Sequence, residues 1–146
     1  MKRLVLTDYL SESATELQQQ ADGWEEAVRR AGGLLERQGY ILPAYTQAMV
    51  DMVKELGPYI VIMPGVALAH ARPEGNVKRN SIALVTFRQG VPFGNESNDP
   101  VYVVFAIAAT SDQEHLELFR TLAKFIAEEE NVERLKTART YEEIGL

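Results

Sequence analysis

The stretch VYVVFAIAA, from Val101 to Ala109, decides the fold class of this 146-residue chain. It is the longest unbroken apolar run in the sequence, and polar residues do not alternate with apolar ones along it. A strand with one face in water alternates, whereas a strand covered on both faces reads as a continuous apolar run. The run is far shorter than the roughly 20 residues that a helix needs to cross a bilayer. It therefore predicts a central strand with helices on both faces of its sheet.

Other segments extend this sheet. Residues 59–63 (YIVIM) and 81–87 (SIALVTF) have the β-branched and aromatic composition of strands. A Pro-Gly pair separates the first of them from a short apolar run at 66–69, and residues 14–17 are a candidate edge strand. Because helical patterns stand between and around these segments, the fold class is predicted to be α/β or mixed α/β.

Two helices are predicted before the strand at residues 59–63. Asp22 with Glu25 three residues later forms a capping-box pattern, and an apolar stripe at helical spacing follows until Gly39. Pro43 suits the first turn of a second helix, which Gly57 ends. Each of these helices therefore has an apolar face that can pack against the sheet.

A third helix is predicted directly after the central strand. Ser111 and Glu114 form a second capping box there. Short helices are expected to begin at Asn131 and at Thr140, and a short docking helix is expected within residues 4–10. The inward face of the third helix is predicted to carry His115, Leu118, Phe119, Leu122 and Ile126.

Composition and charge exclude several classes of function. The chain is 46% hydrophobic and 25% charged, as globular proteins are, and residues 1–146 are expected to form one domain. The formal net charge of −6 argues against nucleic-acid binding. The absence of cysteine excludes disulfides and thiolate nucleophiles, and two histidines are too few for an all-protein transition-metal site, so no cofactor is expected. The N-terminal residues turn polar too early for a signal peptide, which predicts a cytoplasmic location.

His70 is the first candidate catalytic residue. The apolar run 66–69 leads directly into it, and Arg72 follows in the adjoining turn. Small residues at Ala69 and Ala71 leave the imidazole sterically open. A neutral imidazole nitrogen can attack a phosphoryl group and form a phosphoramidate that passes to another protein. The alternative is an ordinary strand-end histidine bonded to a loop carbonyl.

His115 is the second candidate, because it falls in the first turn of the helix that follows the central strand. Ligand crevices of open α/β sheets form at such positions, and the positive end of a helix favours an anion. The alternative is a histidine that only packs on Phe119 and Leu122. A basic segment around Arg72, with three further Lys and Arg residues up to Arg88, could attract phosphate or could be a solvated loop.

Several common catalytic motifs are absent. The sequence contains no Gly-x-Ser-x-Gly elbow, no phosphate loop of the form Gly-x-x-x-x-Gly-Lys-Ser/Thr and no Gly-x-Gly-x-x-Gly. Its paired carboxylates lie in predicted helices and fit solvated faces. Histidine chemistry is therefore the strongest remaining signal.

In combination these residues resemble a known family. The segment GVALAHARPEG (residues 65–75) resembles the active-site segment of enzyme IIA proteins of the mannitol–fructose class (EIIA type 2) in the bacterial phosphoenolpyruvate-dependent sugar phosphotransferase system, PTS. Residues 98–101, the apolar strand and the pair His115–Leu116 match the second half of that family. The loop PFGNESNDP (residues 92–100) resembles the ascorbate-specific branch. The resemblance extends from about Leu10 to Ile144.

The resemblance implies a function. In this family, the histidine at the position of His70 receives a phosphoryl group from the phosphocarrier protein HPr and passes it to a cysteine of a IIB component. IIB then phosphorylates the sugar that the membrane component IIC imports. The chain would thus be a phosphotransferase component with a phosphohistidine intermediate, serving L-ascorbate or a related sugar. His115 would support the phosphoryl group, Arg72 is the candidate for neutralising its charge, and a homodimer is compatible with the family.

The resemblance also implies a mixed sheet of about five strands with helices on both faces. Two positions depart from the family pattern. Ala69 stands where the family usually has proline, and Lys54 lies near the place of an arginine of the mannitol-type proteins, although its role cannot be carried over. The alternatives are a regulatory IIA-like module whose phosphorylation controls a transcription factor or transporter, and a domain that has lost phosphotransfer.

Overall fold

The central strand of the sheet is β5 (Val101–Ala108) in the computed structural model, which describes residues 5–146. The other strands are β1 (Thr15–Gln19), β2 (Val61–Met63), β3 (Val66–Ala69) and β4 (Ser81–Val91). Their order across the sheet is β1-β4-β5-β3-β2. β5 runs parallel to β3 and antiparallel to β4, so the sheet is mixed. The predicted five-stranded mixed sheet is confirmed.

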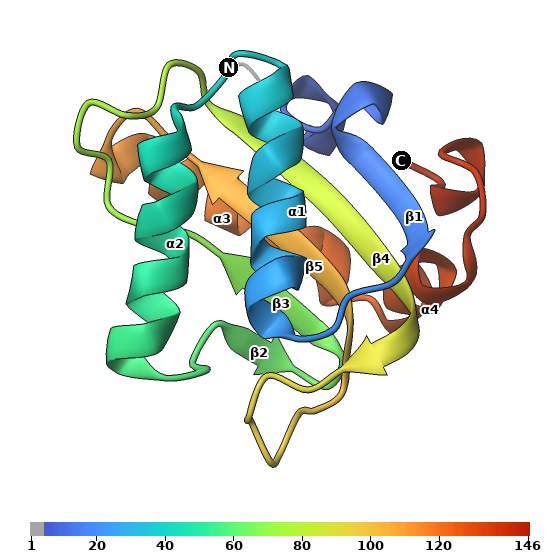
Figure 1. Cartoon of the computed structure of the whole chain (residues 1–146). Helices are drawn as coiled ribbons and strands as arrows, with labels where there is room; N and C mark the ends of the chain where they lie inside the picture. The colour runs from blue at the N-terminus through green and yellow to red at the C-terminus, as the bar shows by residue number, and fades with distance from the viewer. Residues whose placement is uncertain (1–4) are drawn as a thin grey trace.

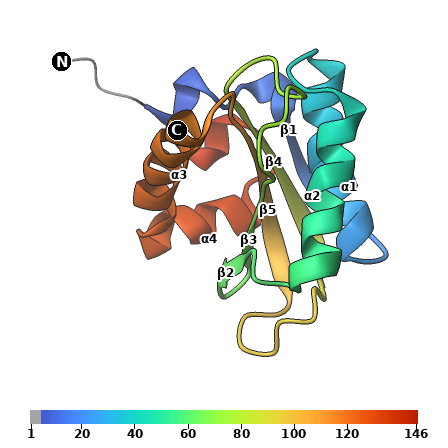
Figure 2. The same cartoon turned by 90° about the vertical axis from the view of Figure 1, so that its left-hand side faces the viewer.

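Two helices cover each face of this sheet, as Figures 1 and 2 show. The first face carries α1 (Trp24–Arg37) and α2 (Pro43–Leu56), and the second carries α3 (Asp112–Ile126) and α4 (Glu129–Thr137). Short 3-10 turns are formed by Leu6–Asp8, Glu12–Ala14 and Glu142–Ile144. The α/β class predicted from the sequence is therefore confirmed as a three-layer arrangement.

The two faces of β5 bury different residues. Val104, Ala106 and Ala108 belong to the core beneath α1 and α2. Val103, Phe105 and Ile107 alternate with them and belong to the core beneath α3 and α4. Complete burial of a side chain the size of valine or phenylalanine stabilises a fold by about 1.5–3 kcal/mol. The non-alternating sequence thus reflects a strand between two separate cores.

The starts of two helices differ from the predicted capping boxes. The N-cap of α1 is Gly23 rather than Asp22, because the helix begins one residue later than the pattern requires. Glycine has no side chain with which to cap the helix. Ser111 caps α3 as predicted and accepts a hydrogen bond from the Glu114 N–H at 3.2 Å. The Glu114 carboxylate accepts from Asn80 at 3.1 Å, so only half of the second box is confirmed.

The C-terminal elements also differ in their starts. Asn131 lies inside α4, where it is buried and donates to the Phe125 carbonyl at 2.8 Å instead of beginning a helix. Thr140 accepts from the Glu143 N–H at 3.3 Å, and the element that follows is one 3-10 turn. In neither case does the hydrogen bond of the polar side chain cap an α-helix.

Strand lengths and the N-terminal segment complete the comparison. β4 runs on to Val91 rather than ending at Phe87, and β2 begins at Val61 because residues 58–60 form a turn. Within the predicted docking helix, Leu6 and Leu10 are buried beside a single 3-10 turn. Leu4, which also belonged to that prediction, lies outside the described residues.

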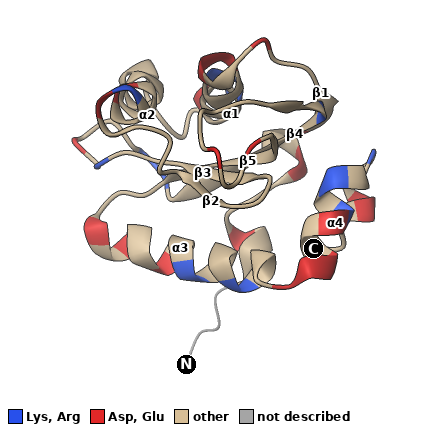
Figure 3. Cartoon of the chain, turned by 90° about the horizontal axis from the view of Figure 1, so that it is seen from below, with Lys and Arg blue, Asp and Glu red and all other residues tan. Residues whose placement is uncertain are grey.

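The charged side chains of α3 change from acidic to basic along the helix. Figure 3 shows acidic residues at the start of this helix and basic residues further along it, which matches the helix dipole. Within residues 5–146, no helix is both long enough and apolar enough to cross a membrane.

Candidate functional site

The two histidines meet because two parallel strands end at the same edge of the sheet. β3 and β5 are neighbours in register, with Ala69 beside Ala106. His70 follows β3 directly, and α3 begins shortly after β5 with His115 in its first turn. The centroids of the two imidazole rings are 5.2 Å apart, and the rings are tilted by 39°. Residues far apart in sequence therefore form one site.

The orientation of His70 fixes which nitrogen is free to react. Its Nδ1 atom lies 2.8 Å from the carbonyl oxygen of Leu68. Because a carbonyl can only accept, Nδ1 carries the proton and donates it. In the neutral ring the lone pair then belongs to Nε2. The ring is half-buried, and the carbonyl bond expected of an ordinary strand-end histidine is the same bond that leaves Nε2 available.

Tyr59 is a site residue that the sequence interpretation missed. Its hydroxyl lies 3.4 Å from Nε2 of His70, and its ring meets the imidazole edge-on at a centroid distance of 5.8 Å. Burial raises the pKa of the Tyr59 phenol, so the hydroxyl keeps its proton at neutral pH. The hairpin of β2 and β3 folds Tyr59 back onto the end of β3. The two short strands predicted on either side of the Pro-Gly pair indicated such a hairpin, and a hairpin places residue 59 near residue 70.

His115 is held in its neutral form. Burial is the main cause that lowers its pKa, the neighbouring His70 lowers it further, and Asp112 acts in the opposite direction. The ring also packs against Phe119 at a centroid distance of 6.3 Å, as the packing alternative predicted. At neutral pH the imidazole can therefore offer an N–H to an anion but no full positive charge.

A buried tyrosine anchors the residue after His70. The hydroxyl of Tyr45, on α2, accepts from the Ala71 N–H at 3.0 Å and donates to the Ile107 carbonyl at 2.6 Å. Burial raises the pKa of Tyr45 to about 12, so the phenol stays neutral. One side chain thus ties the segment that carries His70 to the end of the central strand.

Asn80 performs the same task for the start of α3. Its side-chain oxygen accepts from the Thr110 N–H at 2.9 Å, and its amide donates to Glu114 at 3.1 Å. These bonds join the segment before β4 to the turn that carries His115. Because Asp112 and Glu114 already balance the positive end of α3, the helix end alone is a weak anion site and the side chains must supply the contacts.

Arg72 makes no hydrogen bond or ion pair with either histidine within residues 5–146. Its side chain is exposed and makes no hydrogen bond or ion pair with another residue of the described chain. It lines a hollow at the C-terminal end of α2, beside Met52 and Leu56. Lys54 is turned toward α1, where it lies 3.5 Å from Glu25. Neither cation is held at the imidazoles.

The basic segment does not form one patch. The Arg79 guanidinium lies over the Tyr40 ring at 4.9 Å. Arg88 stands seven residues beyond Ser81 along β4, which is roughly 23 Å at 3.3 Å per residue. These charges are therefore spread along the sheet instead of gathering beside His70.

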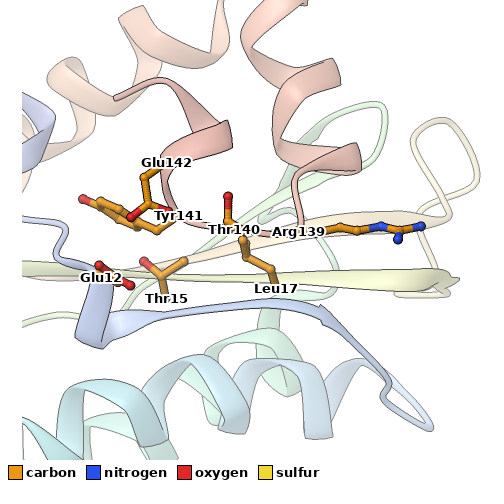
Figure 4. A pocket seen from close by; sticks show the side chains of 7 residues that line it. All are labelled: Glu12, Thr15, Leu17, Arg139, Thr140, Tyr141 and Glu142. Atoms are coloured by element: carbon orange, nitrogen blue, oxygen red, sulfur yellow. The ribbon is translucent and has the colours of Figure 1, made fainter.

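A second hollow lies between β1 and the C-terminal segment, as Figure 4 shows. It contains no histidine, and the Tyr141 hydroxyl on its wall donates to the Leu10 carbonyl at 3.1 Å. No group of three or more potential metal ligands occurs among residues 5–146. The residues that line the hollow are Glu12, Thr15, Leu17, Arg139, Thr140, Tyr141 and Glu142.

Comparison with known proteins gives a consistent result. Residues 8–145 match the model of the family "Phosphoenolpyruvate-dependent sugar phosphotransferase system, EIIA 2". The ascorbate-specific PTS system EIIA component of Escherichia coli K12 is 38% identical over 141 residues, which cover 95% of this chain and 92% of that protein.

Two solved structures show the same fold. The mannitol-specific cryptic phosphotransferase enzyme IIA CmtB from Escherichia coli matches with a TM-score of 0.87 at 32% identity, over 97% of this chain and 95% of that one. Enzyme IIA-mannitol from Escherichia coli, in complex with phosphorylated enzyme IIB-mannitol, matches with a TM-score of 0.82 at 29% identity, over 92% of each chain.

Proposed function

Because the chain belongs to the EIIA 2 family of the phosphoenolpyruvate-dependent sugar phosphotransferase system, we propose that His70 is the residue on which it carries the phosphoryl group. Membership makes the chain a phosphotransferase component of sugar uptake. The single observation that supports His70 is the bond from its Nδ1 to the Leu68 carbonyl, which leaves Nε2 as the nucleophile.

The transfer needs little covalent chemistry from the protein. The Nε2 lone pair attacks phosphorus while the bond between phosphorus and the donor breaks, and the donor keeps that electron pair. The donor we propose is phospho-HPr. His115 offers a ring N–H to a phosphoryl oxygen from the adjoining position. Arg72 is exposed in the same segment as His70 and could reach the phosphate only by changing its side-chain conformation.

The surroundings of the site suit a protein partner. Tyr59, which lies beside His70, is 41% exposed. Leu116, which follows His115 in the sequence, is 48% exposed. Leu56, at the end of α2, is 64% exposed. Apolar surface around a reactive group favours docking of another protein. The related IIA protein that was solved with phosphorylated IIB supports a IIB component as the acceptor.

The cargo we propose is L-ascorbate. The support is the 38% identity to an ascorbate-specific EIIA component over nearly the full length of both proteins. In this scheme the sugar is bound by IIB and IIC, so the specificity of this chain is its choice of IIB. A regulatory role would use the same phosphohistidine and a different acceptor.

Phosphorylation of the purified protein by phosphoenolpyruvate, enzyme I and HPr tests the proposal. Mass spectrometry under alkaline conditions should locate one phosphoryl group on His70, and His70→Ala should abolish the label while the circular dichroism spectrum stays unchanged. An ascorbate-type IIB should then take the phosphoryl group faster than a mannitol-type IIB. A label on another residue, or no label on the folded wild type, would overturn the assignment of His70.

A further inference from the structure

We infer that the Tyr59 hydroxyl is a second hydrogen-bonding group of the phosphoryl site, in addition to His115. Before transfer it donates to the lone pair of His70 Nε2, and after transfer it donates to an oxygen of the phosphoryl group bound there. This role rests on the proposed function, because it requires a phosphoryl group on Nε2. It makes Tyr59 a catalytic residue that contacts the reacting atom.

The geometry around Nε2 carries the inference. Nδ1 is already engaged with a carbonyl, so the hydroxyl of Tyr59, 3.4 Å from Nε2, can only donate to it. The only other polar contact of this hydroxyl within the described chain is the sulfur of Met52 at 3.9 Å, which is a weak acceptor. The hydroxyl is therefore free to turn toward a stronger acceptor when one arrives.

The two rings are held in place by one residue of β3. The Leu68 N–H donates to the carbonyl of Ile60, the residue after Tyr59, at 2.9 Å. The Leu68 carbonyl accepts from Nδ1 of His70 at 2.8 Å. The Asn95 amide also donates to the Pro58 carbonyl at 3.3 Å, on the other side of Tyr59. Because these bonds join the turn to the strand, the approach of Tyr59 to His70 is built into the hairpin.

The charge of the site explains why such a donor is needed. A phosphoryl group brings negative charge to Nε2, yet Lys54 is paired with Glu25 and Arg72 contacts neither imidazole. His115 is neutral because burial and His70 lower its pKa. Neutral donors that are already oriented stabilise developing charge effectively in a partly water-excluded site. Tyr59 and His115 would then approach the phosphoryl oxygens from two directions.

No proton moves in this step. The hydrogen bond from Tyr59 to the Nε2 lone pair breaks, and that pair forms the new N–P bond as the bond between phosphorus and the donor breaks. The electron pair of the broken bond stays on the donor atom that held the phosphorus. Nδ1 keeps its proton toward Leu68, and the Tyr59 hydroxyl keeps its own while it turns to a phosphoryl oxygen.

The test compares Tyr59→Phe with Tyr102→Phe. Both changes remove only a hydroxyl, and Tyr102 lies near the start of β5, at the opposite end of that strand from the histidines. Tyr59 is 41% exposed and Phe keeps its ring, so both variants should fold. The readouts are the phosphoryl-exchange equilibrium with HPr, the rate of acceptance, and the lifetime of the phosphohistidine followed by phosphorus NMR.

In Tyr59→Phe we expect the equilibrium constant for phosphorylation of His70 to fall by roughly five- to ten-fold, because a hydrogen bond to a charged group is stronger than the neutral one it replaces. The nitrogen NMR signal of Nε2 in the unphosphorylated protein should also shift, and neither change should appear in Tyr102→Phe. If the wild type is labelled on His70 and the two variants behave alike, this inference is wrong and the proposed function stands. If the wild type itself takes no label, the proposed function is wrong.

Discussion

At the scale of the residue, the backbone decides the chemistry of His70. A carbonyl two residues back along the chain selects the proton position of the ring, and the buried neighbour Ala71 is fixed by Tyr45. His115 adds a donor whose neutrality is set by its burial and by His70. In the transfer that we propose, one ring would therefore supply the lone pair and the other an N–H.

Substitution of His115 should separate support from packing. His115→Ala should slow phosphoryl acceptance by about ten-fold or more while His70 is still labelled, because one oriented donor to the phosphoryl group is lost. His115→Gln keeps an N–H donor of similar length and should recover part of the rate. Stopped-flow measurement with phospho-HPr gives these rates. Wild-type rates in His115→Ala would reduce His115 to a packing residue on Phe119.

The lowered pKa of His115 also predicts a dependence of stability on pH. In the unfolded chain the imidazole takes up its proton near pH ~6.5, whereas in the folded protein it does so only at lower pH. Between these two values the unfolded state binds more protons, so the free energy of unfolding falls as the pH falls. Urea unfolding at several pH values should show a shallower dependence in His115→Gln than in the wild type. Equal slopes would contradict the pKa shift.

At the scale of the element, the sequence predicts strands and helices better than their ends or contacts. The unbroken run at 101–109 identified a two-sided strand because burial on both faces leaves a direct trace in composition. The capping pattern at Asp22 failed because a one-residue shift of a helix start costs little and the pattern does not fix it. Tyr59 was missed and Arg72 remains without a contact, because distance across a turn depends on side-chain direction and not on spacing.

The connection between β4 and α3 provides a prediction at this scale. Asn80→Ala removes the bonds to Thr110 and Glu114, and we expect it to lower the free energy of unfolding by about 1–2 kcal/mol. Because the same bonds hold the turn before His115, phosphoryl transfer should slow as well. Asn76→Ala, in the same loop, is the control, since within residues 5–146 its side chain accepts a single bond, from the Glu74 N–H. Denaturant titration measures the stability of each variant, and transfer kinetics measure its rate. If Asn80→Ala loses stability but transfers the phosphoryl group at the wild-type rate, the coupling is contradicted.

At the scale of the whole molecule, the sheet separates two cores. In the layer that covers the first core, α1 and α2 pack tightly against each other at one point. A Cβ atom at Gly32 on α1 would lie 2.5 Å from the hydroxyl oxygen of Thr46 on α2. That hydroxyl is held by its bond to Glu36 at 2.6 Å, so it cannot move aside freely. The neighbouring Gly33 has open space around it.

These two glycines form a matched pair for the packing of α1 on α2. Gly32→Ala should lower the free energy of unfolding by about 1–2 kcal/mol, because overpacking outweighs the gain in helix propensity. Gly33→Ala should raise it by about 0.5–1 kcal/mol, because only the propensity term applies there. Thermal and urea unfolding of both variants would show opposite signs. A stabilised Gly32→Ala would mean that the two helices can separate without cost.

The two imidazoles are attached to different layers of this molecule. His70 is braced from α2 through Tyr45, on one side of the sheet, whereas His115 belongs to α3, on the other side. The distance of 5.2 Å between their ring centroids therefore depends on how the two helix layers are aligned across the sheet. A substitution that shifts either helix layer along the sheet changes this distance, even if the substitution lies far from both rings. Slow phosphotransfer can therefore indicate a displaced helix in an otherwise folded protein.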